Sequence, residues 1–100
     1  MTSKLPIIEV NAERVQHLHG IRAANSSNDA KRQEQRILEA LSRHSATTFE
    51  LSRHLDVYDP PARIFNLRKA GHKIAMSWVK QETEAGKLHR VGLYTLEGQA

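Results

Sequence analysis

ELSRHLDVYDPPARIFNLRKAGHKI, which runs from Glu50 to Ile74, contains two helical patterns, a short turn between them and a closing glycine. The first pattern begins at Thr47-Thr48-Phe49-Glu50, which matches a capping box: a hydroxyl at the cap and a carboxylate three residues later each accept a backbone N–H. Leu51 and Leu55 follow at helical spacing. The sequence therefore predicts a helix over residues 48–55 that buries both leucines.

The second helical pattern follows the turn Asp56-Val57-Tyr58. Asp59 stands where a helix cap is expected, and Pro60 and Pro61 occupy the first turn, in which an absent N–H leaves no helical bond unmade. Its buried stripe consists of two residues at helical spacing, Ile64 and Leu67. Gly71 then predicts a left-handed stop at the C-terminal end of this helix.

Upstream, another helix is predicted to run from a cap at Asn28 or Asp29 to about His44. Its buried stripe consists of three residues, Ile37, Leu38 and Leu41. Downstream, residues 74–79 alternate as in a half-buried strand, and residues 88–96 form a second strand after a polar loop. These two strands predict a β-hairpin.

The first part of the chain looks separate, because a polar, loop-forming cluster closes it. We expect a flexible N-terminal arm, partly disordered, over residues 1–28, followed by a folded domain over residues 29–97. In the alternative interpretation the arm is ordered in part. Asn11 would then cap a short helix over residues 12–19, and residues 5–10 would dock on the domain as a strand.

Three helices followed by a β-hairpin is the element order of a winged helix-turn-helix, which is an α+β fold. Residues 47–74 resemble the helix-turn-helix core of bacterial and phage DNA-binding domains, with E-L-x-x-x-L in the second helix, a valine in the turn and R-I-x-x-L-R-x-x-G in the third. The ladder Arg63–Ile74 and the following Trp78 resemble a family of small winged helix-turn-helix proteins common in phages and prophages. The resemblance covers roughly residues 33–96. The sequence departs from the general pattern at Asp56, where such turns often have glycine.

The net charge of the chain is +4 and is unevenly placed, because residues 1–30 carry no net charge and residues 31–100 carry the whole excess. An anionic partner is therefore favoured. The chain has no cysteine, which excludes a disulfide scaffold and a thiolate metal site. It also lacks an apolar run long enough to span a bilayer, so we expect a cytoplasmic protein with no membrane partner.

Acidic residues are absent from Pro60 to Gln81. Five positive side chains fall in that run, namely Arg63, Arg68, Lys69, Lys73 and Lys80. The resemblance implies that the third helix enters the major groove of double-stranded DNA and that the hairpin, or wing, reaches an adjacent run of phosphates. Neutralised phosphates release counterions, and this release supplies affinity that does not depend on sequence.

The outward positions of the third helix are predicted to be Pro61, Ala62, Phe65, Asn66 and Lys69. Asn66 could hydrogen-bond adenine at two atoms, and Arg63 could do so to guanine. Phe65 or Ala62 could touch a thymine methyl group. The other predicted DNA contacts are Thr48, Arg53, Arg68, Lys73, Lys80, Lys87 and Arg90.

Several of these residues have a purely structural alternative. Arg63 and Arg68 could be surface arginines that pair with acids of the preceding helix and turn, and Phe65 could lie in the core. The acids in question are Glu50 and Asp56. In the wing, the basic residues could belong to a solvated hairpin tip.

The six histidines have spacings that do not suit a metal site, and the sequence has no Ser–His–carboxylate arrangement and no glycine-rich phosphate loop. We therefore expect no metal, no cofactor, no small-molecule substrate and no enzymatic activity. Two hypotheses for the function remain. The first is sequence-specific binding of double-stranded DNA by a phage or prophage transcriptional regulator, or by an accessory factor in replication or excision, which could act as a homodimer. The alternative is a winged-helix module for protein–protein interaction that does not bind DNA.

Overall fold

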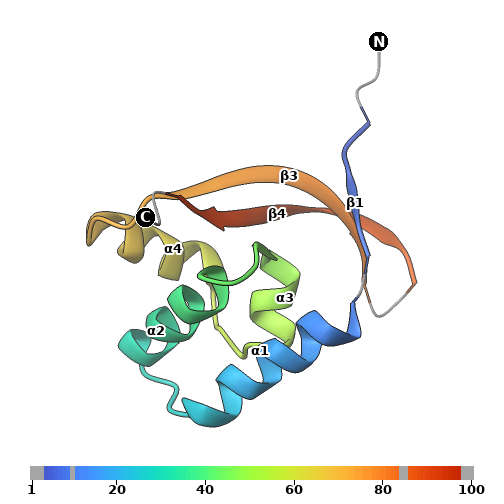
Figure 1. Ribbon diagram of the computed structural model, residues 1–100. Helices are drawn as coiled ribbons and strands as arrows, with labels where there is room; N and C mark the ends of the chain where they lie inside the picture. Colours follow the sequence, from blue (N-terminus) through green and yellow to red (C-terminus); the bar gives the residue numbers. More distant parts are fainter. Residues whose placement is uncertain (1–3, 10, 84–85, 98–100) are drawn as a thin grey trace.

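The computed structural model describes residues 4–9, 11–83 and 86–97. The helices are α1 (Ala12–Ala24), α2 (Ala30–Leu41), α3 (Thr48–Arg53) and α4 (Pro60–Lys69). The strands are β1 (Ile7–Ile8), β2 (Ala46–Thr47), β3 (Ile74–Glu82) and β4 (Leu88–Leu96). In Figure 1 the hairpin of β3 and β4 arches over one side of the helices, with β1 beside it. The predicted order of helix, helix-turn-helix and hairpin is confirmed.

The sheet has the strand order β1-β3-β4-β2. β3 and β4 pair antiparallel without interruption from Ile74 opposite Leu96 to Glu82 opposite Leu88, which confirms the predicted hairpin. The two short strands form the edges: β1 pairs parallel with β3, and β2 pairs antiparallel with β4. The sheet therefore joins the wing to the segment before α1 and to the segment that leads into α3.

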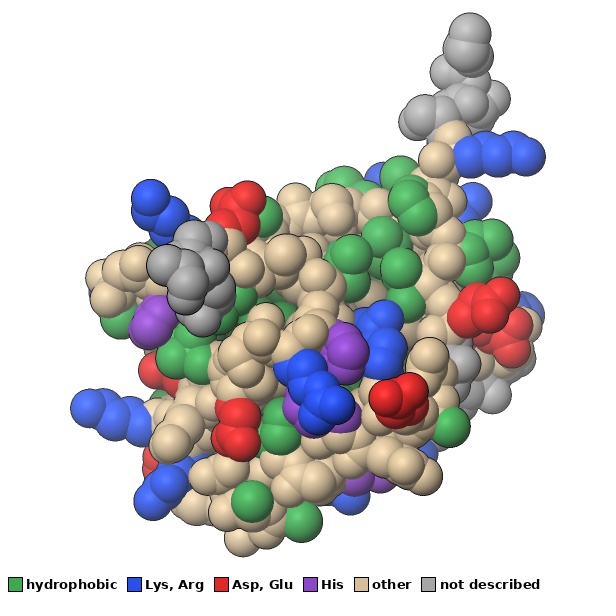
Figure 2. Space-filling model, in the orientation of Figure 1, with side chains coloured by type: hydrophobic (Ala, Val, Ile, Leu, Met, Phe, Trp, Pro, Cys, Tyr) green, Lys and Arg blue, Asp and Glu red, His purple; other side chains and the backbone are tan. Residues whose placement is uncertain are grey.

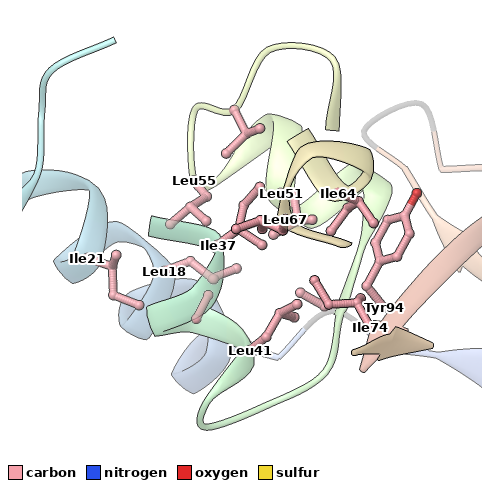
Figure 3. Close-up of a cluster of buried hydrophobic side chains, with 13 residues drawn as sticks. Leu18, Ile21, Ile37, Leu41, Leu51, Leu55, Ile64, Leu67, Ile74 and Tyr94 are labelled. Carbon is pink, nitrogen blue, oxygen red and sulfur yellow. The ribbon is translucent and has the colours of Figure 1, made fainter. Parts of the chain in front are cut away.

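Every helix contributes to one apolar core, and the inner end of the sheet closes it (Figure 3). Side chains from the four helices and from both long strands converge in the close-up: Leu18, Ile21, Ile37, Leu41, Leu51, Leu55, Ile64, Leu67, Ile74 and Tyr94. The predicted stripes of α2, α3 and α4 are buried here, although Leu38 packs only at the margin. Burial of this apolar surface is the main favourable term in the folding of so small a chain.

The capping box of α3 is present in both directions. The Thr47 hydroxyl accepts the Glu50 N–H at 3.0 Å, and the Glu50 carboxylate accepts the Thr47 N–H at 3.0 Å. The helix ends at Arg53, two residues earlier than predicted, but Leu55 is buried as expected. Sequence chemistry alone therefore determines where the first helix of the helix-turn-helix begins.

The turn between α3 and α4 contains two residues with a left-handed backbone, Asp56 at φ 58° and Asp59 at φ 51°. Asp56 thus adopts the conformation that glycine provides in related turns, and aspartate is one of the few other residues that tolerate it. Asp59 occupies the cap position of α4 as predicted, but its side chain makes no capping hydrogen bond. The prediction of a side-chain cap is wrong in this respect, because a cap residue normally has an extended backbone and Asp59 does not.

The end of α4 follows the sequence prediction closely. Gly71 has φ 103°, its N–H donates to the Arg68 carbonyl at 3.0 Å, and the His72 N–H donates to the Leu67 carbonyl at 3.1 Å. These two bonds define a Schellman motif, which needs a left-handed residue at the position of Gly71. The chain therefore turns sharply from α4 into the hairpin.

The expectation of a partly disordered arm over residues 1–28 is wrong for the part of that segment that the structure describes. α1 carries Leu18 and Ile21 into the core, and the Asn11 side chain caps it as the alternative interpretation had it. The helix extends to Ala24, well beyond the predicted end at His19. The weak amphipathic pattern concealed α1, because only two of its side chains are buried. Before α1, the Lys80 N–H donates to the Pro6 carbonyl at 2.8 Å, and this bond helps to hold β1 on β3.

α2 begins at the predicted cap, where the Asp29 carboxylate accepts the Arg32 N–H at 2.9 Å. It ends at Leu41 rather than near His44, and the Ala40 carbonyl then accepts both the Arg43 N–H, three residues on, and the His44 N–H, four residues on, each at 3.2 Å. None of the helices in the described part of the chain is long and apolar enough to cross a membrane.

Arg36 in the middle of α2 is completely buried. Its Nη1 donates to the carbonyls of Asn25 and Ser27, each at 2.6 Å, and its Nη2 donates to the Asp56 carbonyl at 3.0 Å. A single side chain therefore holds the loop after α1 and the turn of the helix-turn-helix together. Sequence reasoning missed this role, because an arginine on a helix is usually exposed.

The core position of α1 leads to a test by substitution. We expect Leu18→Ala and Ile21→Ala each to lower the free energy of unfolding by roughly 2–5 kcal/mol, because each removes buried methyl groups and leaves a cavity. Gln16→Ala, at an exposed position of the same helix, should change it by less than about 0.5 kcal/mol. Urea denaturation followed by circular dichroism measures these differences. Changes as small as that of Gln16→Ala would show that α1 does not contribute to the core.

Replacement of Arg36 by methionine keeps an unbranched apolar stem but removes the guanidinium group with its donors. We expect Arg36→Met to lower the free energy of unfolding by about 3 kcal/mol or more, because three carbonyls lose a charged donor. Arg32→Met is the matched control, since Arg32 is exposed on the same helix. Equal denaturation midpoints for the two variants would contradict the role assigned to Arg36.

Candidate nucleic-acid interface

The outward face of α4 is formed by residues that follow one another at intervals of four, Pro61, Phe65 and Lys69, and all three are exposed. Phe65 is 60% exposed, so the alternative that placed it in the core is wrong. The Lys69 ammonium lies 5.5 Å from the centre of the Phe65 ring. Ala62, beside Pro61, is half-buried. This face is therefore apolar at the start of the helix and positive at its end.

Two of the predicted base-reading residues, Arg63 and Asn66, contact α2. The carboxylate of Glu34 accepts a hydrogen bond from Arg63 Nη1 at 3.3 Å and another from Asn66 Nδ2 at 3.1 Å. The ion pair that sequence analysis considered for Arg63 therefore exists, with a different acid from the two proposed. Glu34 was not recognised as a partner because it lies 29 residues away in the sequence, on another helix.

Arg68 supports the corner between α4 and the wing. Its Nε and Nη2 both donate to the carbonyl of Ile74, at 3.0 and 2.7 Å. This fork fixes the first residue of β3 relative to the last turn of α4. Arg68 thus has a structural function in addition to the positive charge that it adds to an exposed position.

The basic residues predicted in the wing are all exposed, namely Lys73, Lys80, Lys87 and Arg90. Lys80 and Arg90 lie opposite each other in the hairpin. The Arg90 guanidinium carbon lies 4.6 Å from the centre of the Trp78 ring, a stacked cation–π contact. The wing therefore carries positive charge along the strands as well as near the hairpin loop.

A groove of about 290 Å³ lies between the start of α3, the start of α4 and the wing. Its lining comes from all three elements: Thr48, Pro61, Met76, Trp78, Arg90, Val91, Gly92 and Tyr94. Gly92 allows the close approach, because a Cβ there would lie 3.3 Å from both the Thr48 hydroxyl and the Met76 side chain. We call this hollow, with the adjoining Phe65, the α4–wing groove.

The structure thus brings a subset of the predicted DNA-contacting residues together. Thr48, Pro61 and Arg90 line the α4–wing groove, and Phe65 and Lys69 continue it along α4. Arg53 lies at the opposite end of α3 from Thr48 and is not among the residues that line the groove. The site therefore combines the recognition helix with the strands of the wing.

Sequence reasoning missed Met76 and Trp78 as surface residues. They share a face of β3 with Ile74, and the alternating pattern suggested that this face is half-buried. Ile74 is buried, whereas Met76 is 41% and Trp78 is 47% exposed. Further along β3 it is the opposite face of the strand that is buried, since Val79 is only 2% and Gln81 only 1% exposed. A signal in the sequence was Gly92, which lies opposite Trp78 in the hairpin and leaves the indole without a neighbouring side chain there.

Another face of the molecule has a different charge distribution. In the view of Figure 2, lysine and arginine side chains are interspersed with aspartate and glutamate, and histidines gather near the middle. This mixed pattern contrasts with the run from Pro60 to Gln81, which contains no acid. Opposite charges within a few ångströms cancel much of each other's field, so such a mixed face attracts a polyanion weakly.

The histidines form contacts between α1 and the rest of the domain. His19 Nε2 lies 3.2 Å from His54 Nδ1, and the rings of His17 and His44 meet edge to face with centres 5.5 Å apart. Within the described residues, no group of three or more histidine, aspartate or glutamate side chains is placed to hold a metal ion. These histidines therefore act as packing groups between α1 and the rest of the domain.

The surroundings of His17 and His54 lower the pKa of both imidazoles below the usual value of 6.5. Burial is the largest cause in each case. For His17, the Arg43 cation and His44 lower the pKa further, while Glu39 raises it. For His54, His19 has the next largest effect and lowers the pKa, Glu50 raises it, and Arg53 and Arg22 lower it further.

Comparison with known proteins agrees with this architecture. The fold and the groove define a winged helix-turn-helix protein, in which a recognition helix stands beside a β-hairpin wing. The model of a winged helix-turn-helix domain family matches residues 32–99. The chain belongs to this family, whose domain type indicates DNA binding. No curated protein and no solved structure matches the chain.

The lowered pKa values predict a stability that depends on pH. The unfolded chain takes up protons at these histidines near pH 6.5, whereas the folded chain does so only at lower pH. The contribution of neutral His17 and His54 to the free energy of unfolding is complete above about pH 6.5. It is lost as the pH falls towards the lowered pKa values that the two imidazoles have in the folded chain. We therefore expect a lower denaturation midpoint at pH 5.5 than at pH 7.5.

His54→Gln should reduce this pH dependence, since it removes one of the two shifted imidazoles. His89→Gln, at an exposed position in the wing, serves as the control and should leave the dependence unchanged. Urea midpoints measured in half-unit steps of pH decide the question. An unchanged pH profile in His54→Gln would contradict the assignment.

Proposed function

We propose that this protein binds double-stranded DNA through α4 and the wing. The observation that supports this proposal most strongly is the run from Pro60 to Gln81, which contains no acidic residue. This run includes α4 and most of β3, which lie on the two sides of the α4–wing groove. Lys69 stands on the α4 side, and Lys80 and Arg90 stand on the wing side. A surface with positive groups on both sides matches the two phosphate runs that flank a groove of DNA.

In this arrangement α4 enters the major groove and the wing follows the backbone. Lys69, Lys73, Lys80, Lys87 and Arg90 contact phosphates, and these contacts provide affinity and orientation rather than sequence selection. The outward face of α4 approaches the base edges. Thr48, at the beginning of α3, donates to a phosphate beside the major groove of the DNA.

We further propose that DNA binding serves regulation of transcription, or an accessory step of replication or excision, in the cytoplasm of a cell that carries a phage or prophage. The basis is the resemblance of the Arg63–Ile74 ladder to small phage-type proteins. The protein acts by binding alone and needs no cofactor. A homodimer on two half-sites would raise affinity and selectivity beyond what one small domain provides.

A second candidate function, docking of another protein, is favoured by a specific observation. Met76 and Trp78 are exposed large apolar side chains on the wing, and Phe65 is exposed on α4. A protein partner could cover them. The positive groups on both sides of the same surface argue for DNA as the partner, and the response to salt separates the two possibilities.

The test is a titration of random-sequence duplex DNA, labelled with a fluorophore, at several salt concentrations. We expect the logarithm of the affinity to fall linearly with the logarithm of the salt concentration. Lys69→Ala and Arg90→Ala should each lower the affinity and reduce the slope by about one, because each removes one phosphate contact. Fluorescence anisotropy measures both quantities.

Arg43→Ala is the charge-matched control, because Arg43 is exposed near α1 and away from the α4–wing groove. It should leave the slope unchanged. The absence of binding by folded protein at low salt would refute the proposal and favour a protein partner. Equal losses in all three variants would show a diffuse attraction rather than a defined interface.

A further inference from the structure

The hydrogen-bonding side chains of α4 are already engaged within the protein. Glu34 accepts from both Arg63 and Asn66, and Arg68 donates twice to the Ile74 carbonyl. Arg63 and Glu34 are each only about one-fifth exposed. To read a base edge, Arg63 or Asn66 would have to leave a carboxylate that would then lose its partners. These polar groups are therefore poorly placed to select a DNA sequence.

Apart from Lys69 at its end, the side chains that remain on the outward face are apolar. Pro60 and Pro61 fill the first two positions of α4 and carry no N–H, so this end of the helix lacks two of the donors that normally point at a phosphate. Phe65 follows one turn later. The apolar surface continues across the groove to Met76 and Trp78 on the wing. The part of the site that can reach base edges is thus a hydrophobic strip with a cationic border.

We propose that this strip recognises the 5-methyl groups of thymine, so that the protein selects T-containing sites by apolar contact rather than by hydrogen bonds. The inference rests on the proposed binding of DNA and specifies what is read there. The cationic border decides between DNA and an apolar protein segment: Lys69 lies over Phe65, and Arg90 lies over Trp78. Each aromatic ring is thereby accompanied by a group that binds phosphate.

The chemistry of the major groove supports this choice. The thymine methyl is the apolar group that a standard base pair presents there, and the side chains that contact it are small or aromatic. Removal of a methyl from water onto such a surface favours binding by roughly fourfold. A site with two or three such contacts would therefore discriminate by an order of magnitude or more.

The test uses DNA from which only the methyl groups are missing. Duplexes of 24 base pairs are first enriched from a random library by binding to the wild-type protein and are then resynthesised with deoxyuridine in place of thymidine. Charge and Watson–Crick pairing remain the same. We expect the uracil duplexes to bind at least about fourfold more weakly, with an unchanged dependence on salt.

The variants Phe65→Ala and Trp78→Ala should each show a smaller preference for thymine over uracil duplexes than the wild-type protein, because each removes one of the apolar contacts. Both residues are exposed, and circular dichroism confirms that the variants fold. Ile7→Ala is the control, since Ile7 is an exposed apolar residue on β1 at the edge of the sheet, and it should keep the full preference for thymine.

The possible outcomes separate the two proposals. Salt-dependent binding that is equal for thymine and uracil duplexes would overturn the inference and leave the proposed function intact. A preference for thymine that is undiminished in both variants would also overturn it, because the methyl groups would then be read elsewhere. Failure to bind any duplex at low salt would refute both proposals and would point to a protein as the occupant of the groove.

Discussion

The buried guanidinium of Arg36 is the interaction on which the arrangement of the helices depends. It ties the carbonyls of Asn25, Ser27 and Asp56 to the middle of α2. A chain of 100 residues buries only a small apolar core, so these three hydrogen bonds supplement it in holding the two loops. The charged donor fixes both at once, and it lets Asp56 adopt a left-handed backbone in the turn of the helix-turn-helix. The geometry between α3 and α4 is therefore set from α2.

α2 also determines which surface of α4 faces outwards. Two residues before Arg36, Glu34 holds Arg63 and Asn66 against α2, and this leaves the apolar side chains of α4 in solvent. The wing then adds Met76 and Trp78 to the same surface, since the close approach of α3 to the hairpin requires the glycine at position 92. The character of the interface follows from packing between elements that are distant in the sequence.

Much of the fold could be predicted because its signals are local. The capping box of Thr47 and Glu50, the prolines at the start of α4 and the left-handed Gly71 each involve neighbours within a few residues, and each appears as expected. The core stripes of α2, α3 and α4 followed from helical spacing alone. α1 was underestimated because it buries only Leu18 and Ile21, and a pattern of two residues is too weak to exclude an arm.

From the order of residues alone, the chain was recognisable as a winged helix-turn-helix with an acid-free positive run, since caps, turns and periodicity act over short distances along the backbone. The tertiary structure decided which of those positive and polar groups are available. Glu34 lies 32 residues before Asn66, and Trp78 is exposed on β3 whereas its neighbour Val79, on the opposite face of the strand, is buried. Such contacts depend on the packing of whole elements in three dimensions, and no local pattern encodes them.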